Sequence, residues 1–211
     1  MCLAAEGALD LSRIFVIPSN VPPHRAQTHA SAFHRFAMVA SAIADHQAWR
    51  ASDLELRHAG TSFTADTLRK FHERGYAPAD LFFIIGADAF TEIATWRDYP
   101  RILDRTHFAV VSRPGHPSGA LPYTLPDLGS RMVSPPLEAL AVMDPSIVLI
   151  DAPTANVSST AIRQRCAEGQ SLAGLVSSRV QAHIEQHGLY AATNRRRIDQ
   201  STQPPAEPLH G

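Results

Sequence analysis

Two serines, a threonine and an arginine stand together near residue 160 in a pattern that suits a phosphate group. The segment reads Val157-Ser-Ser-Thr-Ala-Ile-Arg163, and a helix is predicted over residues 158–168. Ser159 and Thr160 would lie at the helix N-terminus, where free N–H groups and the helix dipole favour an anion. Arg163, one turn later, could direct its guanidinium back along that face onto a phosphate. Taken alone, the motif is more typical of an ordinary hydroxyl cap with a surface arginine.

A glycine, an aspartate and an arginine follow two of the predicted strands. Gly86 and Asp88 come after the apolar run 81–85, and Arg113 follows the run 107–112. Gly86 would allow a ribose or base to approach closely, and Asp88 would accept a hydroxyl or position a metal-bound phosphate. The plainer alternatives are a turn glycine and a helix-capping aspartate. Because ligands of open parallel sheets bind at the carboxyl ends of strands, these residues favour a phosphorylated, nucleotide-like ligand.

Trp96 is the aromatic residue with a candidate binding role. It lies in the polar setting Thr95-Trp-Arg-Asp98. A tryptophan is more often part of the core, but it can also stack on a flat ring. Thr64 is by default a hydroxyl near a helix N-terminus, and His24 and Arg25 are by default a solvated loop. No pair of histidines has the spacing of metal ligands, so the residues alone predict no metal site.

Apolar runs and amphipathic stretches alternate along the chain and predict an α/β fold. Continuous apolar runs indicate strands buried on both faces, which is typical of a doubly wound, mainly parallel sheet covered by helices. The pattern predicts strands at 13–17, 49–56, 81–85, 107–112 and 147–150. It predicts helices at 1–9, 33–45, 62–75, after residue 86, and at 99–105, 158–168 and 177–187, with an irregular excursion over 114–146.

Composition narrows the classes of protein. The chain has 211 residues, 45% of them hydrophobic, which suits one globular domain; we expect it over residues 1–190, with a disordered tail at 191–211. Nineteen basic and twenty acidic residues give a net charge of −1, so no broad positive field points to nucleic acid or a membrane surface. The only cysteines, Cys2 and Cys166, exclude a disulfide scaffold and fit a cytoplasmic protein.

Taken together, several segments resemble bacterial nicotinate-nucleotide adenylyltransferase, of the nucleotidyltransferase superfamily. Each motif is modest, but their joint order and spacing is specific, and the resemblance covers roughly residues 1–190. The matching segments are Ile17-Pro-Ser-Asn-Val-Pro-Pro-His-Arg25, Ser62-Phe-Thr-Ala-Asp-Thr-Leu68, Phe83-Ile-Ile-Gly-Ala-Asp88, Thr95-Trp96, Ile102-Leu103, Val110 to Gly115, Val157 to Arg163, and Gly188-Leu-Tyr190.

The resemblance implies a Rossmann-like fold and an enzyme of NAD biosynthesis. Such an enzyme transfers the adenylyl group of ATP to nicotinate mononucleotide, with Mg²⁺ on the phosphates, and releases nicotinate adenine dinucleotide and pyrophosphate. The residues implied for ATP are Gly86, Asp88, Ser159, Thr160 and Arg163. Those implied for the nicotinate nucleotide are Thr64, Trp96, Asn20, His24, Arg25 and Arg113.

Two departures from the family pattern stand out. Arg97 replaces the aromatic residue that often follows the tryptophan, so one wall of the nicotinate pocket differs. In addition, nothing in the chain matches the family's first strand and its G-G-T-F-D-P-x-H-x-G-H motif, whose histidines stabilise the triphosphate. The first residues look like the end of a helix without a cap. We therefore expect Met1 to be an internal methionine of a longer enzyme, and we assign no catalytic residue.

Two other functions compete with this reading. One is a non-catalytic, nucleotide-binding remnant that kept the Ser-Ser-Thr-x-x-Arg cradle. The other is a sister adenylyltransferase with another acceptor, such as pantetheine phosphate or nicotinamide mononucleotide; Thr64, Trp96 and the segment Pro22-Pro-His24 argue against pantetheine phosphate.

Overall fold

The computed structural model describes residues 1–22, 29–58, 60–135 and 144–192. Contacts within the chain divide it into two compact units, Met1–Asn156 and the residues from Val157 onward. No helix of the described residues is long and apolar enough to cross a membrane.

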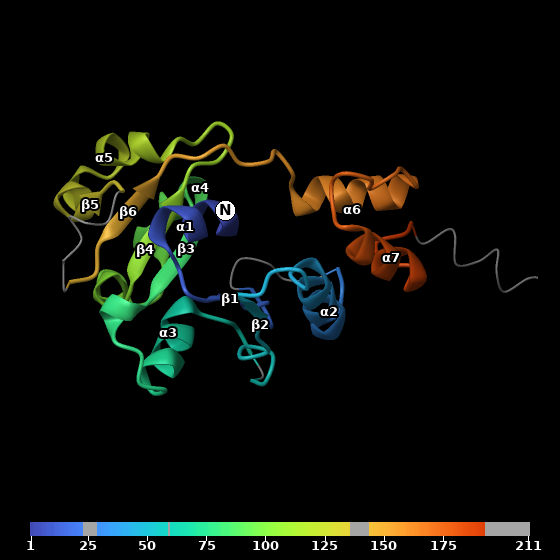
Figure 1. The fold of residues 1–211 in the computed structure, drawn as a ribbon, viewed down its shortest axis with the longest axis horizontal. Helices are drawn as coiled ribbons and strands as arrows, with labels where there is room; N and C mark the ends of the chain where they lie inside the picture. The colour runs from blue at the N-terminus through green and yellow to red at the C-terminus, as the bar shows by residue number, and fades with distance from the viewer. Residues whose placement is uncertain (23–28, 59, 136–143, 193–211) are drawn as a thin grey trace, which may run out of the picture. The chain divides into compact units, whose positions relative to one another are not determined.

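A four-stranded parallel sheet forms the centre of the first unit (Figure 1). Its strand order is β3-β4-β6-β5, and Phe108 of β4 lies beside Phe83 of β3 and Ile147 of β6. The predicted α/β fold with a parallel sheet is therefore confirmed. The strands are β3 (Phe82–Gly86), β4 (His107–Val111), β5 (Met132–Val133) and β6 (Ile147–Ile150).

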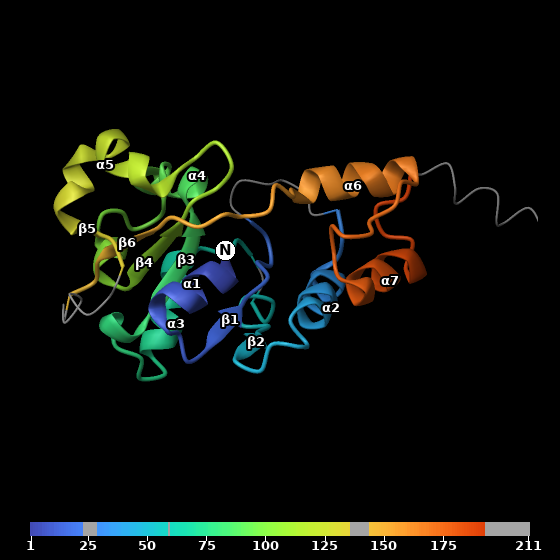
Figure 2. The ribbon, with the colours of Figure 1, turned by 45° about the horizontal axis from the view of Figure 1, so that its top comes forward.

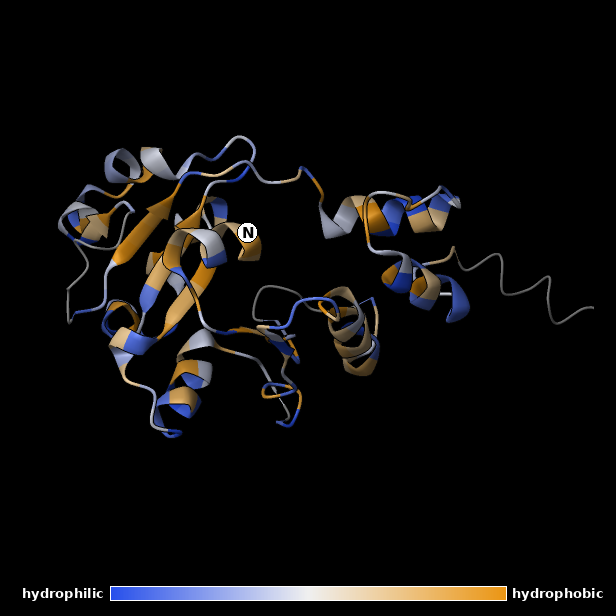
Figure 3. Ribbon diagram, viewed as in Figure 1, coloured by the Kyte–Doolittle hydropathy of each residue, from blue (hydrophilic) through white to orange (hydrophobic). Residues whose placement is uncertain are grey.

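Both faces of this sheet are covered, because successive side chains of a strand point to opposite faces. Figure 3 shows β4 and β6 as the apolar centre of the unit. On one face Phe108 and Val110 pack with Phe90, Ile102 and residues of α3 (Thr64–His72). On the other, the intervening strand residues pack against α1 (Cys2–Leu9), which lies in front of the sheet in Figure 2. The residues buried on this second face are Ala5, Leu9, Ala109, Val111, Val148 and Ile150.

The remaining helices of the first unit are mostly short. Ser31 caps α2 by accepting a hydrogen bond from the backbone N–H of His34. The helices are α2 (Ala32–Ala42), α4 (Ala87–Phe90), α5 (Leu121–Thr124) and the 3-10 helices η1 (Pro78–Asp80), η2 (Ile93–Thr95), η3 (Arg101–Asp104), η4 (Ser118–Ala120) and η5 (Pro126–Arg131).

A second parallel pair of strands lies across a cavity from the main sheet. The pair is β1 (Ile14–Val16) with β2 (Trp49–Ala51). A cavity of about 510 Å³ is lined by Ile14 and Phe15 of β1, by residues 82–84 of β3, and by α3. Among the described residues, β1 pairs only with β2 and β3 only with β4. The edges of β1 and β3 at this cavity are therefore unpaired.

The prediction that residues 114–146 are irregular is wrong for much of the segment. It contains η4, α5 and η5, and then β5, where Met132 and Val133 lie beside Ile147 and Val148 of β6. A strand of two residues is too short to show an alternating or continuous apolar pattern in the sequence. Only its pairing with β6 defines β5 as a strand.

The second unit contains two helices that agree with the predicted ones. They are α6 (Ser159–Glu168) and α7 (Ser178–Gln186). Ser158 and Ser177 cap them by accepting hydrogen bonds from the backbone N–H groups of Ala161 and Val180. The predicted boundary at residue 190 stays a prediction, and residues 193–211 lie outside the described part of the chain.

Candidate functional site

A cavity of about 410 Å³ brings together two of the residues predicted to contact the nicotinate nucleotide. Thr64 contributes from the start of α3 and Trp96 from the loop after η2, while Phe83 and Ile84 of β3 form part of the wall. We call this cavity the Trp96 pocket. It is lined by Ile17, Ser19, Glu55, Ser62, Phe63, Thr64, Ala65, Phe83, Ile84, Thr95, Trp96, Arg97 and Ile102.

Trp96 is held by the core and also faces the pocket. Its ring meets Phe83 edge-on, with ring centroids 5.7 Å apart and an interplanar angle of 86°. The indole is half-buried and packs against the larger apolar cluster. The core therefore fixes the Trp96 ring, which also forms part of the pocket wall; stacking of a ligand ring on the indole stays a prediction.

Thr64 is the first residue of α3. Phe63, at the N-cap position, makes no side-chain cap, and no hydrogen bond among the described residues uses the Thr64 hydroxyl. A half-buried hydroxyl at a helix N-terminus and in a pocket wall can donate to a polar group of a ligand.

Asn20 holds two loops together. Its backbone N–H donates to Ser62 Oγ at 2.9 Å, and its side-chain amide donates to the carbonyl of His58 at 2.8 Å. Arg35 in turn donates to the carbonyl of Asn20 at 2.8 Å. Asn20 is not among the residues lining the Trp96 pocket, but it positions Ser19 and Ser62, which are. His24 and Arg25 lie outside the described residues.

Gly86, Asp88 and Arg113 converge where β3 and β4 end. A Cβ on residue 86 would lie 2.4 Å from Asp88 Oδ1 and 3.1 Å from Arg113 Cγ. No hydrogen bond or ion pair among the described residues uses the carboxylate of Asp88 or the guanidinium of Arg113. Both half-buried groups are therefore available to a ligand at the strand ends, where parallel sheets bind ligands.

The end of β4 is also tied to the end of β6. The Ser112 hydroxyl donates a hydrogen bond to Asp151 Oδ1 at 2.8 Å and accepts one from the backbone N–H of Ser118 at 2.9 Å. The Thr154 hydroxyl donates to the Ser112 carbonyl at 3.0 Å. The network joins segments that are distant in sequence, so it carries no local signal.

The phosphate-cradle motif forms a local arrangement in the second unit. Ser159 and Thr160 are the first residues of α6, and both are exposed. Arg163 Nη2 donates to Thr160 Oγ1 at 3.1 Å, so the guanidinium does turn back toward the helix N-terminus. This contact leaves most of the five N–H donors of the guanidinium for an anion.

Comparison with known proteins places this geometry in a family. A family model described as cytidylyltransferase-like matches residues 2–165. Nicotinate-nucleotide adenylyltransferase of Salmonella typhimurium is 38% identical over 186 residues, covering 86% of each chain. The chain belongs to the nicotinate-nucleotide adenylyltransferase family. A probable nicotinate-nucleotide adenylyltransferase of Citrobacter koseri is 37% identical over 183 residues with the same coverage.

Solved structures agree on the fold of this adenylyltransferase. Plasmodium falciparum nicotinic acid mononucleotide adenylyltransferase, solved as a complex with NaAD, matches with a TM-score of 0.61 and 18% sequence identity. The match covers 89% of this chain and 90% of that chain. At this identity the likeness establishes the Rossmann-like architecture.

Three features of the adenylyltransferase pocket were not predicted from the sequence. Glu55 lines the pocket and accepts a hydrogen bond from Thr67 at 2.6 Å, while its second carboxylate oxygen is buried without a partner among the described residues. Phe63 packs under Arg97, with the guanidinium carbon 4.7 Å from the ring centroid. Ser62 Oγ accepts a hydrogen bond from the backbone N–H of Asn20. Each of these contacts joins segments that are distant in sequence or lack a recognisable motif.

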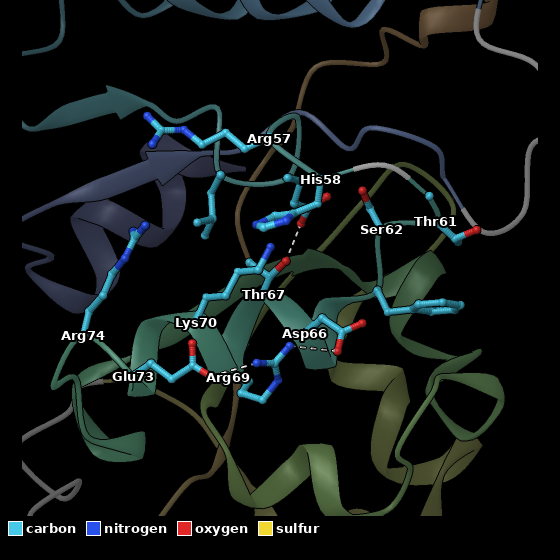
Figure 4. Close-up of a pocket in the computed structure, with 14 residues that line it drawn as sticks. Arg57, His58, Thr61, Ser62, Asp66, Thr67, Arg69, Lys70, Glu73 and Arg74 are labelled. Atoms are coloured by element: carbon cyan, nitrogen blue, oxygen red, sulfur yellow. Dashed lines mark hydrogen bonds and ion pairs between the residues drawn. The ribbon is translucent and has the colours of Figure 1, made fainter.

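A larger cavity of about 570 Å³ lies beside the Trp96 pocket and shares Glu55, Ser62 and Phe63 with it (Figure 4). Arg69 of this cavity is paired with both Asp66 and Glu73, as Figure 4 shows, whereas Lys70 and Arg74 line the cavity without an ion pair among the described residues. Among its residues the sequence predicted no binding role. The aromatic walls and free hydroxyl of the Trp96 pocket fit a pyridine ring better than this charged surface does.

Proposed function

We propose that this chain transfers the adenylyl group of ATP to nicotinate mononucleotide, giving nicotinate adenine dinucleotide and pyrophosphate. The observation that carries the proposal is the Trp96 pocket, in which Thr64 and Trp96 come together from separate segments. The indole offers a stacking surface for the pyridine ring and Thr64 offers a hydroxyl to its polar substituent. The names of the curated relatives support the same reaction.

The reaction needs binding and charge stabilisation more than covalent chemistry. A phosphate oxygen of the mononucleotide bonds to the α-phosphorus of ATP, the bond from that phosphorus to the β-phosphate oxygen breaks, and its electron pair leaves with pyrophosphate. In our proposal Ser159, Thr160 and Arg163 hold the phosphates of ATP, and Gly86 and Asp88 contact its adenosine part. Arg113, which lies beside Gly86, contacts the mononucleotide in this proposal. These groups act by positioning the substrates and meeting negative charge.

Mg²⁺ accompanies ATP in this proposal. The ion prefers oxygen ligands and is usually held by one or two carboxylates together with substrate phosphates and water. Asp88, whose carboxylate has no partner among the described residues, and Asp151, after β6, offer such oxygens, so the residues at the strand ends fit the ion. When bound, Mg²⁺ would neutralise phosphate charge.

Other parts of the proposal concern the setting of the reaction. We propose that residues 1–190 act together as the nucleotidyltransferase domain. The two cysteines are free thiols, which supports a reducing cytoplasm as the compartment.

The direct test is incubation of the purified 211-residue protein with ATP, nicotinate mononucleotide and Mg²⁺. Chromatography should detect nicotinate adenine dinucleotide, and pyrophosphate should appear in equal amount. Binding of both substrates without dinucleotide would instead favour the non-catalytic, nucleotide-binding alternative. Binding of neither substrate by a folded protein would overturn both functions.

The acceptor is tested in the same assay. Nicotinate mononucleotide, nicotinamide mononucleotide and pantetheine phosphate are compared at equal concentration, each with ATP. A higher kcat/KM for nicotinate mononucleotide is expected, and a clear preference for another acceptor would identify a sister adenylyltransferase.

A further inference from the structure

Arg97 contributes the only cationic side chain among the residues that line the Trp96 pocket. The pocket wall is otherwise aromatic, aliphatic or hydroxylic, apart from Glu55, whose Oε1 accepts a hydrogen bond from Thr67 and whose buried Oε2 has no hydrogen-bond partner among the described residues. A cation in this setting can recognise an anionic group on a ring that stacks beside it.

The guanidinium of Arg97 is fixed from two sides. Nη1 donates to Asp66 Oδ2 at 3.1 Å, and the guanidinium carbon lies 4.7 Å from the centre of the Phe63 ring. Because Arg has five N–H donors, the contact with Asp66 leaves the others for a ligand. Asp66 also lies 3.6 Å from Arg69, so a single carboxylate is shared by two cations and does not cancel Arg97.

The backbone around Arg97 is equally constrained. The residue follows Trp96 in a turn closed by a hydrogen bond from Tyr99 N to the Trp96 carbonyl, 3.1 Å long. Asp98 adopts a left-handed conformation with φ 71° and pairs with Arg105 at 2.5 Å. The chain therefore presents Arg97 at the pocket that Trp96 also lines without ordering a free loop, which lowers the entropic cost of binding.

We propose that Arg97 is a specificity-determining residue that binds the pyridine carboxylate of nicotinate mononucleotide and thereby disfavours the carboxamide of nicotinamide mononucleotide. This inference rests on the proposed function. A guanidinium can donate two parallel hydrogen bonds to a carboxylate. A carboxamide has a single acceptor oxygen, which can pair with one guanidinium N–H. Its NH₂ group then faces the second guanidinium N–H, and these two donors are left without an acceptor.

The size of the effect follows from exposure. The Arg97 side chain is 57% exposed, so water screens its charge and competes for its donors. We expect the preference for nicotinate over nicotinamide mononucleotide to fall by about tenfold, rather than the far larger factors of fully desolvated sites, when the guanidinium is removed.

The experiment compares Arg97→Met, Arg97→Lys and Arg69→Gln with the wild-type chain. Arg69→Gln is the matched control, because it removes a cation from the same Asp66 carboxylate but Arg69 does not line the pocket. For each protein, Kd is measured for both mononucleotides and for ATP, and kcat/KM for both acceptors.

Three results are expected. Arg97→Met loses about tenfold of the nicotinate preference, mainly in binding of nicotinate mononucleotide, while its Kd for ATP is unchanged. Arg97→Lys keeps part of the preference, because lysine retains the positive charge but lacks the two parallel N–H donors of the guanidinium. Arg69→Gln keeps the wild-type ratio.

The inference and the proposed function fail in different ways. If the wild-type chain binds nicotinate mononucleotide but Arg97→Met keeps the wild-type ratio of the two affinities, Arg97 does not read the carboxylate and the inference is overturned. If Arg97→Met and Arg69→Gln lower the ratio equally, the effect is a general loss of charge and the inference is again overturned. If the wild-type chain binds neither mononucleotide, the proposed function itself has failed.

Discussion

The carboxylate of Asp88 lies over Gly86, so closely that a Cβ on residue 86 would stand 2.4 Å from Asp88 Oδ1. Gly86 has an ordinary φ of −76°, so its role is to leave room and not to adopt an unusual backbone conformation. Gly86 and Asp88, both candidate ATP-binding residues, therefore constrain each other sterically.

Gly86→Ala should displace the side chain of Asp88 and lower ATP affinity by about tenfold or more. The crowding also reaches Arg113, and overpacking of this kind costs about 1–3 kcal/mol of stability. ATP binding is measured by calorimetry, together with the free energy of unfolding. Gly119→Ala is the control, because a Cβ there would meet nothing within 4 Å. Unchanged ATP affinity in Gly86→Ala would remove Gly86 and Asp88 from the ATP site.

Trp96→Ala should raise the KM for nicotinate mononucleotide more than the KM for ATP. Aromatic stacking contributes about 0.5–1.5 kcal/mol beyond buried area, so the KM for the mononucleotide should rise at least about two- to tenfold. Steady-state kinetics with each substrate varied in turn provides the measurement. A larger effect on ATP would place Trp96 on the other side of the site.

The two tryptophans of the chain allow a direct binding signal. Trp49 is engaged elsewhere, since its indole N–H donates to Glu6 at 2.9 Å and its ring stacks on His46. Nicotinate mononucleotide should therefore quench the fluorescence of Trp49→Phe protein but change that of Trp96→Phe protein little. The opposite pattern would contradict a ring-stacking role for Trp96.

Arg163→Ala should weaken ATP binding by about tenfold or more, because hydrogen bonds to charged groups contribute about 1.5–3 kcal/mol. Arg165→Ala is a matched control: it removes the same charge from α6, but Arg165 is bonded to the carbonyl of Ser171 at 3.0 Å. Calorimetry with ATP distinguishes the two variants. Equal losses would indicate a general charge effect.

His107 makes stability depend on pH. Burial lowers the pKa of this imidazole below its ordinary value, although a backbone hydrogen bond with Ala79 opposes the shift in part. Its Nδ1 accepts a hydrogen bond from the backbone N–H of Ser146 at 3.0 Å, which requires an unprotonated Nδ1. Below pH about 6.5 the unfolded chain therefore binds more protons at this residue than the folded chain does, and the folded state loses stability as pH falls.

The variant His107→Gln isolates this contribution, because an amide oxygen can still accept from Ser146 but does not titrate. The free energy of unfolding is measured by urea titration between pH 5 and 8. The decline of stability below pH 6.5 should be shallower in His107→Gln than in the wild-type chain. Parallel curves would show that His107 is not the group responsible.

Much of the fold follows from local patterns in the sequence. The runs at 81–85, 107–112 and 147–150 each became a strand, because an uninterrupted apolar segment can be buried only between two covering layers. Ser158 and Ser177 marked helix starts through chemistry contained within one turn. In contrast, β5 became a strand only because β6 lies beside it.

The candidate site was partly predictable for the same reason. Thr64 and Trp96 could be marked by short motifs, and the structure brings them into one pocket. The pairing of Arg97 with Asp66 and Phe63 could not be foreseen, since it depends on how the loop after η2 packs against α3. The hydrogen bond from the Asn20 side-chain amide to the carbonyl of His58 could not be predicted, because the two residues are distant in sequence.

The unpaired edge of β3 should be detectable in the rate at which its amide hydrogens exchange with solvent. β4 has a hydrogen-bonded neighbour on each side, whereas alternate N–H groups of β3 face the cavity shared with β1. We expect slow exchange throughout β4 and fast exchange at every second residue of β3. An open row of donors and acceptors is also a template for another extended chain, so concentrated solutions of this protein should aggregate through this edge.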